Sequence, residues 1–391
     1  MKKQIYLDNA ATTKMRPEAM AEYVRISENT WGNPSSLHSL GNDAERIITA
    51  AKQTILYTLS AKDAEVIFTS SGTEANNLAI LGHAHSKDRY KNGAKIITAS
   101  GEHASVSEPI SHLKRLGYKV VELSTRDGLL DLDQLAREMT PDVILVSIMM
   151  VNNETGAVYN LPAVARALRA KCPQALFHVD ATQGYMKIPF TKSGIGADLI
   201  TVSSHKIGGP KGVGALVVDK EVIKRRELAP VVYGGGQSLG LRSGTENVPG
   251  IAAFAEAARL AHSELNESIK KMSSLRERLI GKITSDARLA EISPTLPENH
   301  APHILNLTLP DVKSETMLHY LSSEGIYVSS GSACSSNSGH LSSALTAYGR
   351  SESEADSSIR ISFSPSNTEE DVDALAEALA AGLTKLARIR R

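Results

Sequence analysis

Short apolar runs alternate with amphipathic stretches between residues 60 and 220. Most of these runs are apolar on both faces, as strands are when helices cover both sides of their sheet. They lie at 65–70, 94–100, 118–124, 142–150, 175–181, 198–204 and 214–219. Strands that alternate with helices in this way predict an α/β domain built around a mostly parallel sheet.

The pattern changes near residue 250. Apolar residues recur at spacings of three and four from Phe254 to Leu279, which predicts one long amphipathic helix. A strand at 304–310, a serine-rich loop, a second strand at 359–364 and a final helix follow. Asn367 or Thr368 can cap that helix, and its predicted buried stripe is Val372, Leu375, Leu379, Leu383 and Leu386. We therefore expect a smaller C-terminal α/β domain, joined to the first by the long helix.

Composition and charge exclude several classes of protein. Basic and acidic residues both number 43, so no net charge attracts nucleic acid or an anionic membrane. The most apolar run, 143–151, has about half of the roughly 20 residues that a membrane helix needs. The apolar stretch before Asp8 is too short for a signal peptide, and two cysteines cannot build a disulfide framework or a four-thiolate metal site. We expect a cytoplasmic protein without a bound metal and without direct nucleic-acid or membrane partners.

Polar residues follow several of the predicted strands, where parallel sheets bind their ligands. Lys206 comes after the strand at 198–204, where partial desolvation would make its amine nucleophilic, although many strand-end lysines are simply exposed. Asp180 and Gln183 follow the strand at 175–181. Such a carboxylate is either an exposed strand end or the partner of a protonated pyridine nitrogen, as pyridoxal phosphate enzymes require.

Three further strand ends carry candidate groups. Gly72 and Thr73 begin a helix whose N–H groups can cradle a phosphate, although Ser-Gly-Thr is also an ordinary helix cap. His103 follows a second strand, and Asn152 and Asn153 follow a third. Each could be structural alone, but together with Lys206 and Asp180 they favour one pyridoxal phosphate site.

Nine sequence motifs together resemble the NifS/IscS-type cysteine desulfurases. These are fold-type I pyridoxal phosphate enzymes of the class-V aminotransferase family, and the resemblance runs from Tyr6 to about Phe363. The motifs are YLDNAATT, FTSSGTEANN, EHASV, VNNETG, HVDATQ, SSHKIGGPKGVGAL, GGGQSLGLRSGTEN, SSGSACSS and SSIRISFS. The resemblance implies a large cofactor-binding domain with a mostly parallel seven-stranded sheet over 16–255. It also implies a smaller α/β domain, formed by 1–15 and 256–391.

The resemblance also implies a role for each matching residue. Lys206 would bind pyridoxal phosphate covalently, His103 would stack on its ring and help to move protons, and Asp180 would pair with the ring nitrogen. Gln183 and Asn153 would contact the phenolic oxygen or the substrate. The residues expected to bind the phosphate or another part of the cofactor are Gly72, Thr73, Ser203, Ser204, His205 and, from the partner subunit, Thr245. A contribution from the partner implies a homodimer. Arg360 would hold the substrate carboxylate, because a guanidinium fits a carboxylate through two hydrogen bonds.

The serine-rich loop, at about 329–342, contains Cys334. On its own, a cysteine among such small polar neighbours is either loop filler or a mobile nucleophile. The resemblance implies the second role. L-cysteine would become L-alanine, and its sulfur would pass to Cys334 as a persulfide. Cys172, at a predicted helix end, is expected to be incidental.

From Cys334 the sulfur would go to an acceptor protein, either an iron–sulfur scaffold or a tRNA-thiolation enzyme, for iron–sulfur cluster assembly or thio-modification. The alternatives are a selenocysteine lyase, another fold-type I lyase or aminotransferase, and a non-catalytic sulfur-relay partner protein.

Overall fold

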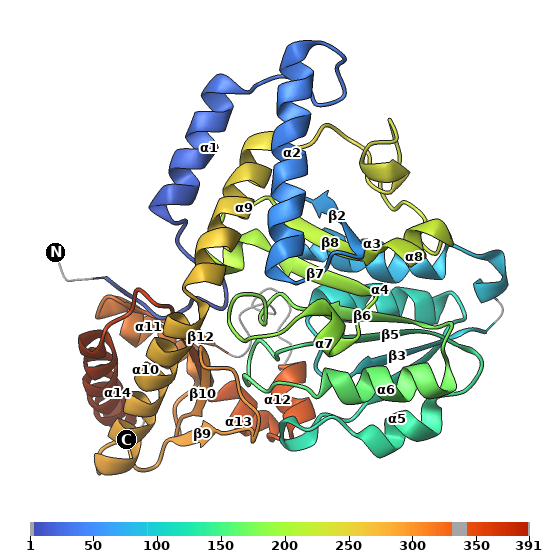
Figure 1. Cartoon of the computed structure of the whole chain (residues 1–391). Helices are drawn as coiled ribbons and strands as arrows, with labels where there is room; N and C mark the ends of the chain where they lie inside the picture. Colours follow the sequence, from blue (N-terminus) through green and yellow to red (C-terminus); the bar gives the residue numbers. More distant parts are fainter. Residues whose placement is uncertain (1–3, 92, 331–341, 390–391) are drawn as a thin grey trace.

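The computed structural model describes residues 4–91, 93–330 and 342–389 (Figure 1). Its main sheet has seven strands in the order β2-β8-β7-β6-β5-β3-β4, and every pair is parallel except those that β8 makes with β2 and β7. The strands are β2 (Ala64–Thr69), β3 (Lys95–Ala99), β4 (Lys119–Leu123), β5 (Val143–Met149), β6 (Leu176–Asp180), β7 (Leu199–Ser203) and β8 (Gly214–Asp219). They coincide with the predicted runs, so the predicted α/β fold with a mostly parallel sheet is confirmed.

Helices cover both faces of this sheet. Neighbouring residues on a strand point to opposite faces, so Ile67 packs with α3 (Gly72–Ala84) and α4 (Ala104–Arg115), whereas Val66 packs with the helices of the other face. Those helices are α2 (Ser39–Thr58), α5 (Leu132–Glu138), α6 (Leu161–Lys171), α7 (Lys192–Ile195) and α9 (Val248–Ser263). Burial on both faces explains why the strands contain almost no exposed polar position.

Two smaller elements complete this part of the chain. Helix α1 (Pro17–Asn29) packs beside α9, at the top of Figure 1, and α8 (Lys220–Lys224) follows β8. Lys192, the first residue of α7, is buried, and its Nζ donates to Asp63 Oδ2 at 2.8 Å and to Asp219 Oδ2 at 2.7 Å. This ammonium therefore ties α7 to the start of β2 and the end of β8.

The single long helix predicted around 254–279 is wrong. Helix α9 ends at Ser263 and α10 (Leu265–Ser285) begins after Glu264, whose ψ of 2° departs from helical geometry. Glu264 also forms an ion pair with Arg16 at 2.8 Å. Phe254 packs in the core of the large sheet, whereas Met272 packs in the core of the C-terminal region. The break therefore lets each half face a different core.

The C-terminal region is a second α/β layer, drawn in orange and red in Figure 1. Its antiparallel sheet has the order β12-β13-β10-β9, and β1 (Ile5–Tyr6) pairs with β11 (Ile326–Tyr327) beside it. The other elements are β9 (Ser293–Thr295), β10 (Ile304–Thr308), α11 (Ser314–Ser323), β12 (Ser329–Ser330), α12 (Ser343–Tyr348), α13 (Glu352–Asp356), β13 (Ser358–Ser362) and α14 (Glu369–Ile389). The domain boundaries given above stay a prediction.

Thr368 caps the final helix, because its Oγ1 accepts from the Asp371 N–H at 3.3 Å. Along α14 the residues Val372, Leu375 and Leu379 are buried, and Leu383 and Leu386 pack against them. Across the described ranges, no helix combines the length and the apolar character needed to cross a membrane.

Candidate active site

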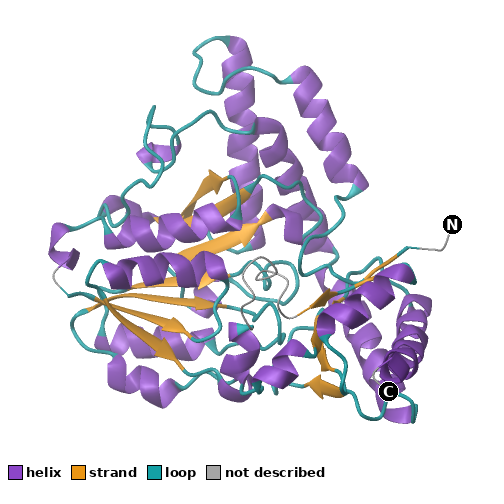
Figure 2. Cartoon of the chain, turned by 180° about the vertical axis from the view of Figure 1, so that it is seen from behind, coloured by secondary structure: helices purple, strands orange, loops and turns teal. Residues whose placement is uncertain are grey.

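The carboxyl ends of the central parallel strands lie toward the smaller sheet, as the reverse view in Figure 2 shows. Asp180 is the last residue of β6 and Ser203 the last residue of β7. His103 caps α4 after β3, and Gly72 begins α3 after β2. The parallel topology therefore gathers these predicted residues at one edge of the sheet.

Asp180 is buried and held through both carboxylate oxygens. Its Oδ1 accepts from the Thr182 N–H at 2.9 Å, and its Oδ2 accepts from Asn76 Nδ2, also at 2.9 Å. Asn76 lies on α3, is 1% exposed, and donates again to Ser105 Oγ at 2.8 Å. Asn76 is not among the residues predicted from the sequence, although its amide is a polar group in an otherwise apolar helix face.

His103 joins the same network through Ser105. The Ser105 hydroxyl accepts from Asn76, so it donates to Nδ1 of His103 at 2.8 Å, and the Ser105 N–H donates to Nδ1 as well, at 3.1 Å. The ring proton is thereby assigned to Nε2. Burial lowers the pKa of His103, with smaller contributions in the same direction from Lys206 and Arg360, while Asp180 opposes the shift. A neutral imidazole follows at neutral pH.

Lys206 closes the short turn after β7. Its Nζ donates to the carbonyl oxygens of Ala10 at 2.8 Å and Ala11 at 2.7 Å. Gln183 Nε2 also donates to Ala10 O, at 2.9 Å. The segment YLDNAATT belonged to the resemblance without a residue role, and the structure places its backbone directly against the predicted lysine.

Gly72, Ser203 and Ser204 are predicted to bind the phosphate or a neighbouring part of the cofactor. A Cβ at Gly72 would lie 3.4 Å from the Ser203 Cβ, so the start of α3 and the end of β7 are close neighbours. The Ser203 hydroxyl is buried and has no hydrogen-bond partner among the described residues. The Ser204 hydroxyl is likewise buried without a hydrogen-bond partner among the described residues, and it lies against Gly209.

Of the three other predicted cofactor residues, His205 lies beside Lys206, and Thr73 and Thr245 are exposed at the surface. His205 Nδ1 is hydrogen-bonded to Thr12 Oγ1 at 3.1 Å, and burial, helped by Lys206 and Lys211, lowers the pKa of His205 to about 4. Thr73 is exposed in the first turn of α3. Thr245 is also exposed, in the connection between α8 and α9, which Arg242 fastens to Glu74 of α3 at 2.8 Å.

Arg360 reaches the site from β13 in the smaller sheet. It is 7% exposed; its Nη2 donates to Asp8 Oδ1 at 2.9 Å and its Nη1 to the carbonyl oxygen of Asn153 at 3.0 Å. Its Nε is buried without a hydrogen-bond partner among the described residues. A buried guanidinium with an unused donor is a natural binding group for a carboxylate.

Cys334 lies outside the described residues, but both flanks of its segment are described. On one side, Ser329 pairs with Arg360 across β12 and β13. On the other, Ser342 Oγ donates to Glu154 Oε2 at 2.5 Å, and Glu154 directly follows Asn153. Both flanks therefore lie beside the residues that surround Arg360.

Cys172 lies elsewhere. It follows α6 at the amino edge of the sheet, where it is 5% exposed and its Sγ contacts Thr140 O at 3.2 Å. Burial raises the pKa of this thiol. A buried thiol at the opposite edge from Asp180 has no access to the site.

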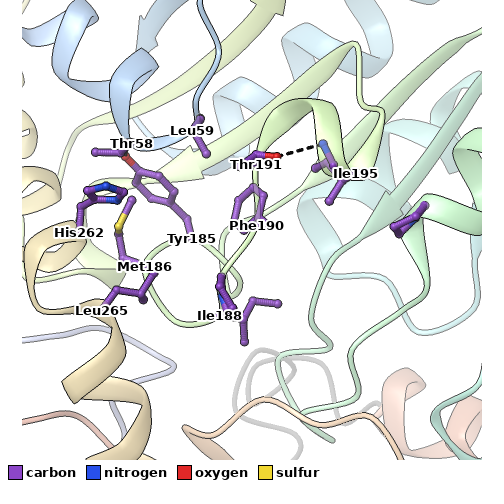
Figure 3. Close-up of a pocket in the computed structure, with 13 residues that line it drawn as sticks. Thr58, Leu59, Tyr185, Met186, Ile188, Phe190, Thr191, Ile195, His262 and Leu265 are labelled. Carbon is purple, nitrogen blue, oxygen red and sulfur yellow. Dashed lines mark hydrogen bonds between the residues drawn. The ribbon is translucent and has the colours of Figure 1, made fainter.

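A cavity of about 520 Å³ lies between α2, α7 and the junction of α9 with α10 (Figure 3). Its lining is mainly apolar and includes Tyr185, Met186, Phe190 and Leu265. Tyr185 points toward Thr58 in Figure 3, and their hydroxyl oxygens are 2.7 Å apart. No predicted site residue lines this cavity, so we place the chemistry at the carboxyl edge of the sheet.

Comparisons with known proteins agree with this fold and site. Residues 5–375 match the family described as aminotransferase class-V, and the chain belongs to that family of pyridoxal phosphate enzymes. It is 39% identical to the NifS/IcsS protein homolog of Lactobacillus delbrueckii subsp. bulgaricus, over 94% of each chain. It is 37% identical to the cysteine desulfurase IscS of Dictyoglomus turgidum, over 100% of this chain and 97% of the relative. A solved structure named as a NifS-like protein superposes with a TM-score of 0.90 at 34% identity, over 98% of this chain and 100% of the other.

The residues at the carboxyl edge fit pyridoxal phosphate. Asp180 offers a buried, fixed carboxylate for a protonated ring nitrogen. The unpartnered Ser203 hydroxyl and the start of α3 offer donors for a phosphate. Lys206 supplies an amine that backbone carbonyl oxygens orient.

Proposed function

We propose that this protein is a cysteine desulfurase, which converts L-cysteine to L-alanine and passes the sulfur to its own Cys334. One observation carries the proposal. The segment that contains Cys334 is bounded by Ser329, paired with Arg360, and by Ser342, bonded to Glu154. A carboxylate-binding arginine, a candidate cofactor lysine and the anchors of a cysteine segment thus meet at one edge of the sheet. An aminotransferase has no use for that thiol.

Lys206 would hold the cofactor covalently, and Asp180 would pair with its ring nitrogen. When bound, pyridoxal phosphate acts as an electron sink that makes the hydrogen on the substrate α-carbon acidic. Gly72, Thr73, Ser203 and His205 would hold the phosphate, and His205 would do so as a neutral donor because its pKa is lowered to about 4. Ser204 supports the turn from the side of Gly209.

The substrate carboxylate would bind Arg360, whose Nε is unused, and Asn153 and Gln183 would contact the substrate or the phenolic oxygen. The Lys206 amine would carry the proton at the α-carbon. His103 would stack on the cofactor ring and, with its proton on Nε2, would donate a hydrogen bond toward the site.

Sulfur transfer balances within the protein and its substrate. The Cys334 thiolate attacks the substrate sulfur, an S–S bond forms, and the C–S bond breaks. The electron pair of that bond stays with the carbon fragment, which takes up protons and leaves as L-alanine. Cys334 keeps the sulfur as a persulfide. The transferred sulfur is oxidised by two electrons, and the substrate carbon is reduced by the same two electrons.

We also propose a cytoplasmic homodimer that hands its sulfur to an acceptor protein, such as an iron–sulfur scaffold or a tRNA-thiolation enzyme. Large apolar side chains are exposed at Trp31, 71%, and at Tyr233, 80%, and Tyr233 lies in the same connection as Thr245. Packing Tyr233 against a partner subunit would remove this large apolar side chain from water. Thr245 would then reach the phosphate of the partner's site.

The test is incubation with L-cysteine and a thiol reductant, followed by assays of sulfide and alanine. Lys206→Ala should abolish both products. Cys334→Ala should lose sulfide but still perturb the cofactor absorbance when L-cysteine binds, and Cys172→Ala, the matched cysteine control, should behave like wild type. Full sulfide release by Cys334→Ala would disprove the persulfide route. A strong preference for L-selenocysteine would favour the lyase alternative.

A further inference from the structure

Glu154 occupies a position that the reaction described above leaves without a role. Its backbone is held in a tight turn, because Asn152 Oδ1 accepts from the N–H groups of Glu154 at 3.0 Å and Thr155 at 2.9 Å. Asn152 Nδ2 in turn donates to Gly101 O at 3.2 Å. The Glu154 backbone is therefore fixed to the loop that leads into His103, and its carboxyl group points from a rigid base.

The carboxyl group of Glu154 makes its described bond to Ser342, at 2.5 Å. Ser342 is the first described residue after segment 331–341, and its Oγ also accepts from the Leu345 N–H at 3.0 Å as the cap of α12. One hydroxyl thus begins α12 and fastens it to the loop after β5. Helix α12 also packs on the large domain, where a Cβ at Gly101 would lie 2.9 Å from the Ala344 Cα, and the Ser342 hydroxyl adds a hydrogen bond at the first turn.

The environment of Glu154 is unfavourable for an ionised carboxyl group. Burial raises the pKa of Glu154 to about 7, although the Ser342 bond and the charge of Arg360 both act to lower it. A carboxyl group that only stabilised the fold would be more favourable at the surface, since burying it carries an energetic cost. The group instead lies within reach of the charge of Arg360, the proposed substrate anchor, and is bonded to Ser342.

We propose that Glu154 is a positioning residue for sulfur transfer, which holds Ser342, the residue that follows segment 331–341, beside the loop after β5. This inference rests on the proposed function. In the proposed reaction Glu154 does not touch the substrate, and it acts through Ser342. Its loss should therefore slow attack by Cys334 without weakening the binding of L-cysteine.

The test compares Glu154→Ala, Glu154→Gln and Ser342→Ala in the holoenzyme. Persulfide on Cys334 is measured by mass spectrometry after rapid mixing with L-cysteine. We expect Glu154→Ala and Ser342→Ala to slow its formation about tenfold, the scale of one buried hydrogen bond. Glu154→Gln keeps an acceptor oxygen and should retain most of the wild-type rate. The double variant Glu154→Ala/Ser342→Ala should be no slower than the slower of its two single variants, because both substitutions remove the same hydrogen bond.

Ser351→Ala is the matched control for the lost helix cap. Ser351 caps α13 as Ser342 caps α12, but its partner is Glu354. The rate of persulfide formation should stay at the wild-type level in this variant. The binding of L-cysteine is measured through the cofactor absorbance in a Cys334→Ala background, where Glu154→Ala should leave the dissociation constant unchanged.

A readout without L-cysteine separates this inference from the proposed function. Hydrogen exchange of the 343–348 backbone should be faster in Glu154→Ala and normal in Glu154→Gln, because only the first loses the anchor. Unchanged exchange and an unchanged persulfide rate in Glu154→Ala would overturn the inference alone. Weakened binding of L-cysteine would also overturn it, since Glu154 would then act through Arg360. Absence of persulfide in the wild-type protein would overturn the proposed function, and this inference with it.

Discussion

The substrate role of Arg360 can be tested through the number of hydrogen bonds that its side chain has left to give. A guanidinium has five N–H donors, and two are used, on Asp8 Oδ1 at 2.9 Å and on the Asn153 carbonyl oxygen at 3.0 Å. Three remain for a ligand, including the unpartnered Nε. The perturbation is Arg360→Lys, which keeps a positive charge beside the partly buried Asp8 and so avoids leaving its carboxylate without a partner.

The expected loss follows from the same count. An ammonium has three donors, and if it keeps both protein contacts it has one left for the substrate carboxylate. The two-pronged contact is reduced to a single bond. One charge-assisted hydrogen bond contributes about 1.5–3 kcal/mol, so the dissociation constant of L-cysteine should rise about 10- to 100-fold.

The assay uses Cys334→Ala as background, so that sulfur transfer does not consume the ligand. L-cysteine and cysteamine, which lacks the carboxylate, are titrated against the cofactor absorbance of this parent and of the same protein with Arg360→Lys added. We expect Arg360→Lys to weaken L-cysteine binding and to leave cysteamine binding unchanged within about twofold. The ratio of the two effects isolates the contact between residue 360 and the carboxylate.

Two results would refute this reasoning. An equal loss of affinity for both ligands would show that the substitution disturbs the site as a whole. Unchanged binding of L-cysteine would show that the carboxylate is held elsewhere, and Arg360 would then be only the partner of Asp8 and Asn153. A melting temperature within a few degrees of the parent would confirm that the variant is folded.

Three further predictions concern residues around the site and the sheet. Asn76→Leu removes a donor to Asp180 and should raise the dissociation constant of pyridoxal phosphate about tenfold in an absorbance titration; an unchanged constant would contradict the role of Asn76. Lys192→Met should lower the free energy of unfolding, measured in urea, by about 1–2 kcal/mol. The loss is limited to this size because Asp63, one of the two carboxylate partners of Lys192, is largely exposed. The surface control Lys224→Met should change the free energy of unfolding by less than about 0.5 kcal/mol. Burial lowers the pKa of His178 to about 4, so between pH 4 and 6.5 the unfolded chain binds a proton that the folded chain does not, and stability falls as the pH falls through this window. His178→Asn should therefore reduce the slope of unfolding free energy against pH by about 1 kcal/mol per pH unit, and an identical slope would argue against a neutral buried imidazole.

The large sheet could be predicted because its strands are buried on both faces and leave continuous apolar runs. The break at Glu264 could not. On each side of it the apolar residues keep helical spacing, and only their packing separates Phe254, in the large core, from Met272, in the smaller one. A helix that changes the core it faces has the same local pattern as a straight helix, since the difference lies in contacts distant in sequence.

The candidate site was predictable to a similar degree and for a related reason. Residues after parallel strands meet at one edge whatever their identity, so Asp180, His103 and Lys206 were found from position. Their supports were not. Asn76 lies 104 residues from Asp180 in sequence, and Glu154 lies 188 residues from Ser342. No local pattern marks such pairs.

The N-terminal segment 8–13 links the two halves of the site. Its Ala10 and Ala11 carbonyl oxygens bind the Lys206 amine, which belongs to the large sheet, while Asp8 binds Arg360 of the smaller sheet. The Ala10 N–H also donates to Ser362 Oγ at 2.8 Å, two residues beyond Arg360 on β13. In the proposed reaction, L-cysteine would react beside the Lys206 amine while Arg360 holds its carboxylate. The relative position of the two groups is therefore fixed by this segment together with the bond from Arg360 to the Asn153 carbonyl oxygen, which joins the two sheets directly.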